Sequence, residues 1–333
     1  MKNSIRAAFV LIALSVTALT AGKSGEITVP KGYRPPDLKA SAELKTILES
    51  SIKDVLATFP NGSFKNDEIA ATLIDLKQPN ELQTASFRGG ERIYPASVVK
   101  MFYMTALERQ LEDGKLTMTP EMERGLHDMI VDSSNEATQY ILDVITDTSS
   151  GAELPQKEFE KWQYKRDRVN RYFAAMGYSN INVNQKTFCE DAYGIEQQSR
   201  SYQGQNRNML TTDAVARLLS EIVLGRMNTP ERTATMMSLL KRDPFSADSG
   251  NPEDQAHGFT GRLFIDRKMT DARLWSKAGS TSKAWHDAAY IETPDGLKFV
   301  IVIFTEDHAN DKNAIPAIVG KVIDGLRARK RSA

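Results

Sequence analysis

The sequence predicts an α+β fold, an α/β sandwich. An antiparallel sheet of about five strands, built from both chain ends and flanked by helices, should carry an inserted all-helical domain. Strand-like segments occur near residues 69–91 and again near 273–305, and the stretch between them has mostly helical apolar spacing. The 333 residues are 41% hydrophobic, which suits one or two domains with an ample core.

The N-terminus predicts export. Residues 1–21 have the three parts of a secretory signal peptide: the basic Lys2 and Arg6, an apolar stretch, and small residues near Ala21. The apolar run is short for a membrane span. We therefore expect a periplasmic or secreted protein with no stable membrane insertion after cleavage, and a retained anchor is the alternative. Residues 22–40 are rich in proline and predict an extended linker.

The first part of the sheet domain is expected within residues 41–96. Residues 41–59 carry apolar side chains at helical spacing, and Ser41 stands at their start. The segments 69–76 and 84–91 then predict a pair of strands.

The second part of the sheet domain is expected within residues 245–333. The runs "ARLWSKAGS", "WHDAAYIE" and "LKFVIVIFTED" predict strands, and "TPDG" at 293–296 predicts a hairpin turn between the last two. A terminal helix should close the chain. Its basic end, "RARKRSA", most simply complements the helix dipole.

Residues 97–244 are expected to form the helical domain. Its helices should comprise one ending near Asp113, then 120–131, 135–146, 157–177 and 211–225.

Composition and motifs exclude several functions. The 43 basic and 43 acidic side chains balance, which argues against nucleic-acid binding. The sequence contains no HExxH, GxGxxG, GxxxxGK or GxSxG pattern, so we expect no metal and no cofactor. Cys189 is the only cysteine, which excludes an internal disulfide. His286 and Asp287 could belong to a triad, but a structural role is the simpler interpretation. We expect a monomer acting on a small molecule.

One short stretch, "IYPASVVKMFYMTAL", places Lys100 in an apolar run three residues after Ser97. On a helix, positions three apart share a face. A buried lysine is costly unless it is paired or neutral. Lys100 could simply extend its amine to water. Alternatively, Ser97 is a nucleophile and Lys100 is its base.

Two further elements favour the second interpretation. "VDSSNEATQYIL" places Ser133 and Asn135 between two predicted helices, and "LWSKAGS" places Lys277 on a strand. In this order the three elements resemble the S-x-x-K, S-x-N and K-[TS]-G motifs of class A β-lactamases and penicillin-binding proteins. The resemblance extends from about Glu43 to Leu326, and it implies the β-lactamase/transpeptidase-like form of the predicted fold.

The resemblance implies a role for each residue. Ser97 would attack a β-lactam or D-alanyl peptide carbonyl and form an acyl-enzyme, and Lys100 would take its proton. Ser133 would relay a proton to the leaving nitrogen. Asn135 would position Lys100 and the substrate amide, and Lys277 would bind the substrate carboxylate. Gly279 would leave room for the substrate beside the strand. The N–H of Ser280 would join that of Ser97 in an oxyanion hole.

The chain also departs from the family pattern. Ala278 stands where a threonine or serine usually binds the substrate carboxylate, and Ser280 and Thr281 are the candidate substitutes for that hydroxyl. The segment between Asn135 and Lys277 is long, with an insertion around 147–207. Glu196 is the candidate base for deacylation, but it lacks the E-x-x-x-N pattern, and the alternative is a solvated loop carboxylate.

The sequence thus supports three hypotheses. The first is an exported class A-like serine β-lactamase that hydrolyses the β-lactam amide through an acyl-enzyme on Ser97. The second is a D-alanyl-D-alanine peptidase or another serine amidase of this fold. The third is a non-hydrolytic β-lactam-binding or peptidoglycan-binding protein.

Overall fold

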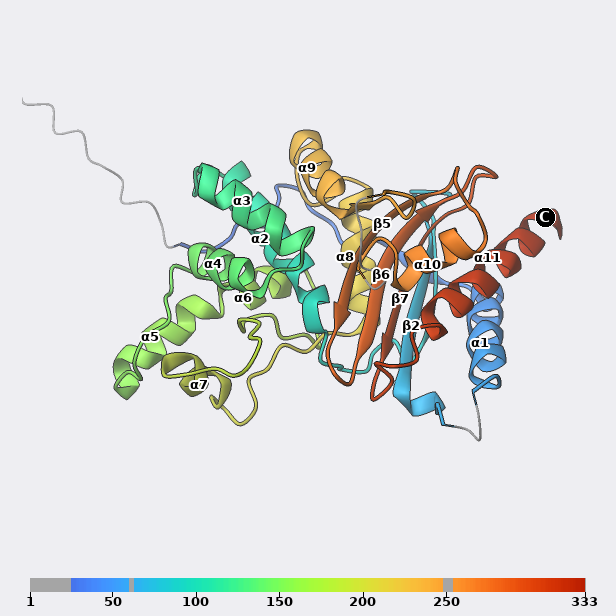
Figure 1. Ribbon diagram of the computed structural model, residues 1–333. Coiled ribbons are helices and arrows are strands. Elements are labelled where there is room, and N and C mark those ends of the chain that lie inside the picture. Colours follow the sequence, from blue (N-terminus) through green and yellow to red (C-terminus); the bar gives the residue numbers. More distant parts are fainter. Residues whose placement is uncertain (1–24, 60–62, 248–253, 333) are drawn as a thin grey trace, which may run out of the picture.

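The computed structural model describes residues 25–59, 63–247 and 254–332, so the predicted signal peptide (1–21) lies outside the described residues. One mixed sheet of seven strands forms the centre of the fold, in the order β1-β3-β2-β7-β6-β5-β4 (Figure 1). Its strands are β1 (Leu38–Ala40), β2 (Ile69–Asp75), β3 (Leu82–Phe87), β4 (Lys241–Arg242), β5 (Arg273–Ser280), β6 (Trp285–Glu292) and β7 (Lys298–Thr305).

The α+β class predicted from the sequence is confirmed, but the sheet of about five antiparallel strands is wrong. The two additional strands are the edges β1 and β4, which have three and two residues. Such short segments carry no periodicity that a sequence pattern could reveal. The sheet is mixed because β1 pairs with β3 in parallel, whereas the other strand pairs are antiparallel.

The central strands are apolar on both faces because both faces are covered. On β7, Val300, Val302 and Phe304 join one core cluster, whereas Phe299 and Ile301 join another. Alternate strand residues point to opposite faces of the sheet, so each cluster fills one side. Full burial of one such side chain stabilises the fold by about 1.5–3 kcal/mol.

Three helices cover one face of the sheet, and Figure 1 shows them on the side away from the helices within residues 100–200. They are α1 (Ala42–Leu56), α10 (Phe259–Asp266) and α11 (Ala314–Ser332). Ser41 caps α1 by accepting a hydrogen bond from the N–H of Leu44.

The other face carries α8 (Thr212–Val223), which contacts β2, β6 and β7. Two more helices contact the sheet, η3 (Ala96–Val99) and α9 (Pro230–Leu240). Farther from the sheet lie α2 (Lys100–Glu112), α3 (Pro120–Ile130), α4 (Asn135–Thr146), α5 (Gln156–Arg166), α6 (Arg168–Ala175) and α7 (Ile195–Arg200) (Figure 1). A short 3-10 turn, η2 (Asn66–Glu68), precedes β2.

Most predicted helices are present, with one clear difference. The helix expected over 157–177 is two helices, α5 and α6, which meet at Asp167. The side chain of Asp167 accepts hydrogen bonds from Asn170 and Asn184. An aspartate that bonds locally in this way competes with helix propagation.

The segment before β1 is extended but packs on the helical region. Ile27 is buried, and Glu26 pairs with Arg171 of α6. Within the described part of the chain, every helix is too short or too polar to cross a bilayer.

Candidate active site

The candidate nucleophile lies at the start of the most buried helix. Ser97 belongs to η3, directly before α2, and is partly exposed, whereas Val98, Val99 and Lys100 are buried. Ala96 has a φ of 46°, a left-handed conformation that is uncommon for a residue with a side chain and that is often found at functional sites. The apolar run around Lys100 is buried, and Lys100 is buried with it.

Gly279 brings β5 against the nucleophile. A Cβ at this position would lie 2.8 Å from the carbonyl oxygen of Pro95 and 2.9 Å from the backbone nitrogen of Ser97. Only glycine permits such a close approach of two backbones. The strand that carries Lys277 is thus held against the turn that carries Ser97.

The S-x-N turn receives Lys100. The Lys100 Nζ atom lies 2.5 Å from the carbonyl oxygen of Ser133, 3.3 Å from Ser133 Oγ and 3.0 Å from Asn135 Oδ1. Ser133 has a φ of 58°, and Ser134 caps α4 by accepting from the N–H of Ala137 at 3.1 Å. These contacts are made to the S-x-N turn, and within the described residues no hydrogen bond joins Lys100 to the Ser97 hydroxyl.

Lys277 approaches the same serine from the other side. Its Nζ atom lies 2.9 Å from Ser133 Oγ and 2.8 Å from the carbonyl oxygen of Ala278. Ser133 Oγ therefore stands between the amines of Lys100 and Lys277, within hydrogen-bond distance of both. This arrangement can pass a proton between groups on the two sides of the cleft.

The environment favours the neutral form of both lysines. Burial lowers the pKa of Lys100 to about 7, although the charges of Glu136 and Cys189 act in the opposite direction. Burial also lowers the pKa of Lys277, and the nearby charges of Lys100 and Arg242 lower it further. An amine with a pKa near 7 can act as a general base at neutral pH.

A cleft of about 620 Å³ opens between the helical region and the edge of the sheet. Its lining includes the predicted Ser97, Ser133, Ala278, Gly279 and Ser280. The volume is in the range of small-molecule sites. The structure thus brings these predicted residues together, and the buried Lys277 and Lys100 lie behind Ser133.

Among the lining residues that the sequence did not predict, Arg242 and Gln255 act on Lys277. Arg242 of β4 is buried, and burial lowers its pKa to about 10. Gln255 lies between β4 and α10, and its Oε1 atom accepts hydrogen bonds from Lys277 Nζ and from the N–H of Ala278. Neither residue stands in a recognisable motif, so only the folded chain reveals them.

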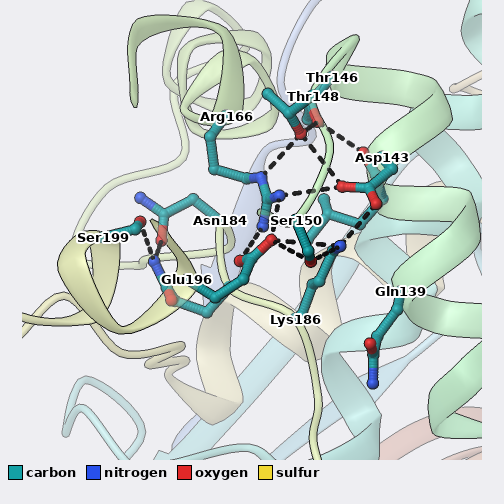
Figure 2. Close-up of polar contacts among 12 residues, drawn as sticks. Gln139, Asp143, Thr146, Thr148, Ser150, Arg166, Asn184, Lys186, Glu196 and Ser199 are labelled. Carbon is teal, nitrogen blue, oxygen red and sulfur yellow. Dashed lines mark hydrogen bonds and ion pairs between the residues drawn. The ribbon is translucent and has the colours of Figure 1, made fainter. Parts of the chain in front are cut away.

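Glu196 lies in a different environment from Ser97 (Figure 2). It is buried, and Arg166 binds both carboxylate oxygens at 2.8 Å. Lys186 Nζ lies 3.2 Å away, and Ser150 donates a hydrogen bond of 2.9 Å. Burial alone would raise the pKa of Glu196, but Arg166 and Lys186 overcome this effect, so the pKa is lowered. A carboxylate bound in this way is a weak base.

Cys189, in the loop before α7 (Ile195–Arg200), contacts the S-x-N turn. Asn135 Nδ2 lies 3.5 Å from the Sγ atom of Cys189, and this thiol lies 3.7 Å from Glu136 Oε1. Glu190 and Glu196 line a hollow with Cys189 that is distinct from the cleft at Ser97.

The histidine alternative has a structural explanation. His286 is buried, with Nε2 3.0 Å from the carbonyl oxygen of Tyr94 and Nδ1 accepting from the N–H of Thr305. Burial lowers its pKa to about 4. Asp287 accepts from the N–H of Thr260. His286 therefore ties the segment before Ser97 to β6 and β7.

Solved structures share this fold. A β-lactamase from Sphaerobacter thermophilus is 20% identical, with a TM-score of 0.57 over 84% of this chain and 95% of its own. TLA-1 extended-spectrum β-lactamase is 14% identical, with a TM-score of 0.60 over 85% and 99%. PBP-A is 15% identical, with a TM-score of 0.57 over 89% and 100%. At these identities the likeness concerns the fold.

The sequence comparison identifies the family. No curated protein matches the chain in sequence. Residues 119–323, more than half of the chain, match the sequence profile of the Beta-lactamase enzyme family (Beta-lactamase2). This range includes the S-x-N turn and β5, and it begins after Lys100. The chain therefore belongs to the Beta-lactamase enzyme family.

Proposed function

We propose that this protein is an exported, class A-like serine enzyme that opens the amide of β-lactams through an acyl-enzyme on Ser97. The observation that carries the proposal is the position of the Ser133 hydroxyl between the buried amines of Lys100 and Lys277, beside the cleft lined by Ser97. Family membership supports the β-lactam as substrate class.

The first half-reaction uses groups already in the cleft. Neutral Lys100 accepts the Ser97 proton while Ser97 Oγ bonds to the β-lactam carbonyl carbon. The carbonyl oxygen becomes an oxyanion, which the N–H groups of Ser97 and Ser280 would stabilise, each by about 3 kcal/mol. As the C–N bond breaks, Ser133 delivers a proton to the nitrogen and is reprotonated from the lysine side.

The second half-reaction is the hydrolysis of the acyl-enzyme by water. The candidate base for this water is Glu196, which is held in ion pairs with Arg166 and Lys186. To accept a proton from the water, Glu196 would have to weaken these ion pairs. We therefore propose that deacylation is slow compared with acylation. This favours a second candidate function, a penicillin-binding D-alanyl-D-alanine peptidase or amidase. One neighbouring structure is a PBP-A mutant in an acyl-enzyme complex with penicillin G.

The mass of the intact protein after addition of penicillin G or a cephalosporin tests the proposal, with Ser97→Ala as the control. We expect one adduct with the full mass of the drug, located on Ser97 by peptide mapping and absent from Ser97→Ala. Loss of the adduct together with destruction of the drug measures β-lactamase turnover. An adduct that persists identifies the penicillin-binding alternative, and no adduct with either drug contradicts both.

A further inference from the structure

The side chain of Gln255 spans the candidate cleft. Its Oε1 atom accepts from Lys277 Nζ at 2.7 Å and from the N–H of Ala278 at 3.0 Å. Its Nε2 atom donates to the carbonyl oxygens of Ile130 at 3.0 Å and Val131 at 2.8 Å. One amide thus connects β5 to the C-terminal end of α3.

These four contacts use the full hydrogen-bonding capacity of the amide, which has two donor hydrogens and a carbonyl oxygen with two lone pairs. They also fix its orientation. A flipped amide would point its NH₂ group at Lys277 Nζ and its oxygen at two carbonyl oxygens. The oxygen of Gln255 must therefore face Lys277.

The two groups that Oε1 contacts, Lys277 Nζ and the N–H of Ala278, form a pair of hydrogen-bond donors for one oxygen atom. Lys277 Nζ is a buried amine whose other partners are a hydroxyl and a carbonyl oxygen, and the N–H of Ala278 lies on the cleft side of β5. Lys277 is mostly neutral without a charged partner, but a carboxylate placed beside Nζ favours its protonated form. The protonated amine and the backbone N–H then bind an anionic oxygen more strongly than a neutral one. The methyl group of Ala278 adds no competing hydroxyl.

We propose that Gln255 is a specificity-determining residue that occupies this pair of donors with a neutral oxygen. A substrate that acylates Ser97 and places a carboxylate against Lys277 must displace Gln255 Oε1. A substrate without this carboxylate does not need to displace it. Gln255 therefore discriminates against anionic donors. This inference rests on the proposed acylation of Ser97.

The test compares penicillin G with its methyl ester, which differ at the carboxylate. Acylation rates by intact-protein mass give an acid-to-ester ratio for the wild type and for Gln255→Ala and Gln255→Met. Methionine keeps the length of the side chain but removes its carbonyl oxygen. We expect both variants to raise the ratio about tenfold, because the carboxylate then binds Lys277 Nζ and the N–H of Ala278 without competition from Gln255 Oε1.

Two further variants sharpen the comparison. Gln255→Glu places a negative charge against Lys277 and should lower the ratio below that of the wild type. Gln198→Ala is the matched control, because Gln198 also bridges backbone groups, the N–H and carbonyl of Leu154, but lies outside the cleft. It should leave the ratio unchanged.

An unchanged ratio in Gln255→Ala and Gln255→Met, with both donors acylating the protein, would overturn the inference alone. Equally faster acylation by penicillin G and its methyl ester would also overturn the inference, because it would show that Gln255 acts only through its steric bulk. No adduct on any variant with either donor would overturn the proposed function, and this inference with it.

Discussion

Two clusters of buried basic side chains differ in whether carboxylates pair with them. Around Glu196, two cations and two carboxylates alternate: Arg166 and Lys186 each contact both Glu196 and Asp143 (Figure 2). Around Ser133, Lys100 and Lys277 contact hydroxyl, amide and carbonyl groups, and no carboxylate bonds to either lysine within the described ranges.

The difference separates structure from chemistry. Matched buried ions keep their charges and hold segments in place, whereas an unmatched buried lysine tends to lose its proton. The first cluster ties α7 to α5 through Glu196 and Arg166, and ties the loop before α7 to α4 through Lys186 and Asp143. The second has the properties of a proton-transfer site. Disrupting the cluster around Glu196 should therefore lower stability and leave acylation unchanged. Disrupting the cluster around Ser133 should slow acylation and leave stability unchanged.

The largest effect is expected from Lys100→Met. Loss of the general base should slow acylation of Ser97 about a thousandfold, while the melting temperature should not fall, because the substitution removes an unmatched buried amine. Lys186→Met is the matched control: it should keep the acylation rate and lower the melting temperature. Equal acylation in both variants would remove the distinction between the clusters.

A smaller effect is expected when the spacing between β5 and the turn that carries Ser97 is increased. Gly279→Ala would place a Cβ 2.9 Å from the backbone nitrogen of Ser97, so β5 and η3 must separate. Displacement of reacting groups by about 1 Å can cost about a hundredfold in rate. Stopped-flow acylation measures this, and Gly90→Ala, at a position where a Cβ meets nothing within 4 Å, should acylate like the wild type.

Breaking the matched cluster should instead cost stability. Glu196→Gln leaves two buried cations with one carboxylate, and we expect the free energy of unfolding to fall by about 3 kcal/mol. Since the folded-state pKa of Glu196 lies below 4.5, this contribution is present above that pH and is lost as the pH falls. Urea unfolding at pH 7 measures the loss. The rate of acyl-enzyme decay should not change, and a slower decay would instead identify Glu196 as the deacylation base.

The smallest effect concerns a charge near Lys100. Glu136 raises the pKa of Lys100, so Glu136→Gln should lower that pKa and increase the neutral fraction in mild acid. We expect acylation to be a few times faster at pH 6 and unchanged at pH 9, where Lys100 is already neutral. A variant that is slower at both pH values would show that Glu136 acts through the geometry of the turn.

The sequence predicted the parts of this site that are marked by motif or periodicity. The apolar run around Lys100, the S-x-N element at the start of α4 and the strand carrying Lys277 were all recognisable locally. The edge strands β1 and β4 were too short to leave a pattern. The binding of Glu196 by Arg166 and Lys186 was hidden because its partners lie 30 and 10 residues away in sequence. Gln255 was hidden for the same reason, since it meets β5 only in the folded chain.

The pH dependence of Ser97 acylation in the wild type tests the central claim most directly. With Lys100 as the base and its pKa at about 7, the acylation rate should rise as the pH increases through neutrality and then level off. A rate that is flat across this range, or one that keeps rising toward the ordinary lysine value of 10.5, would contradict the assignment of Lys100 as a neutral, unmatched base.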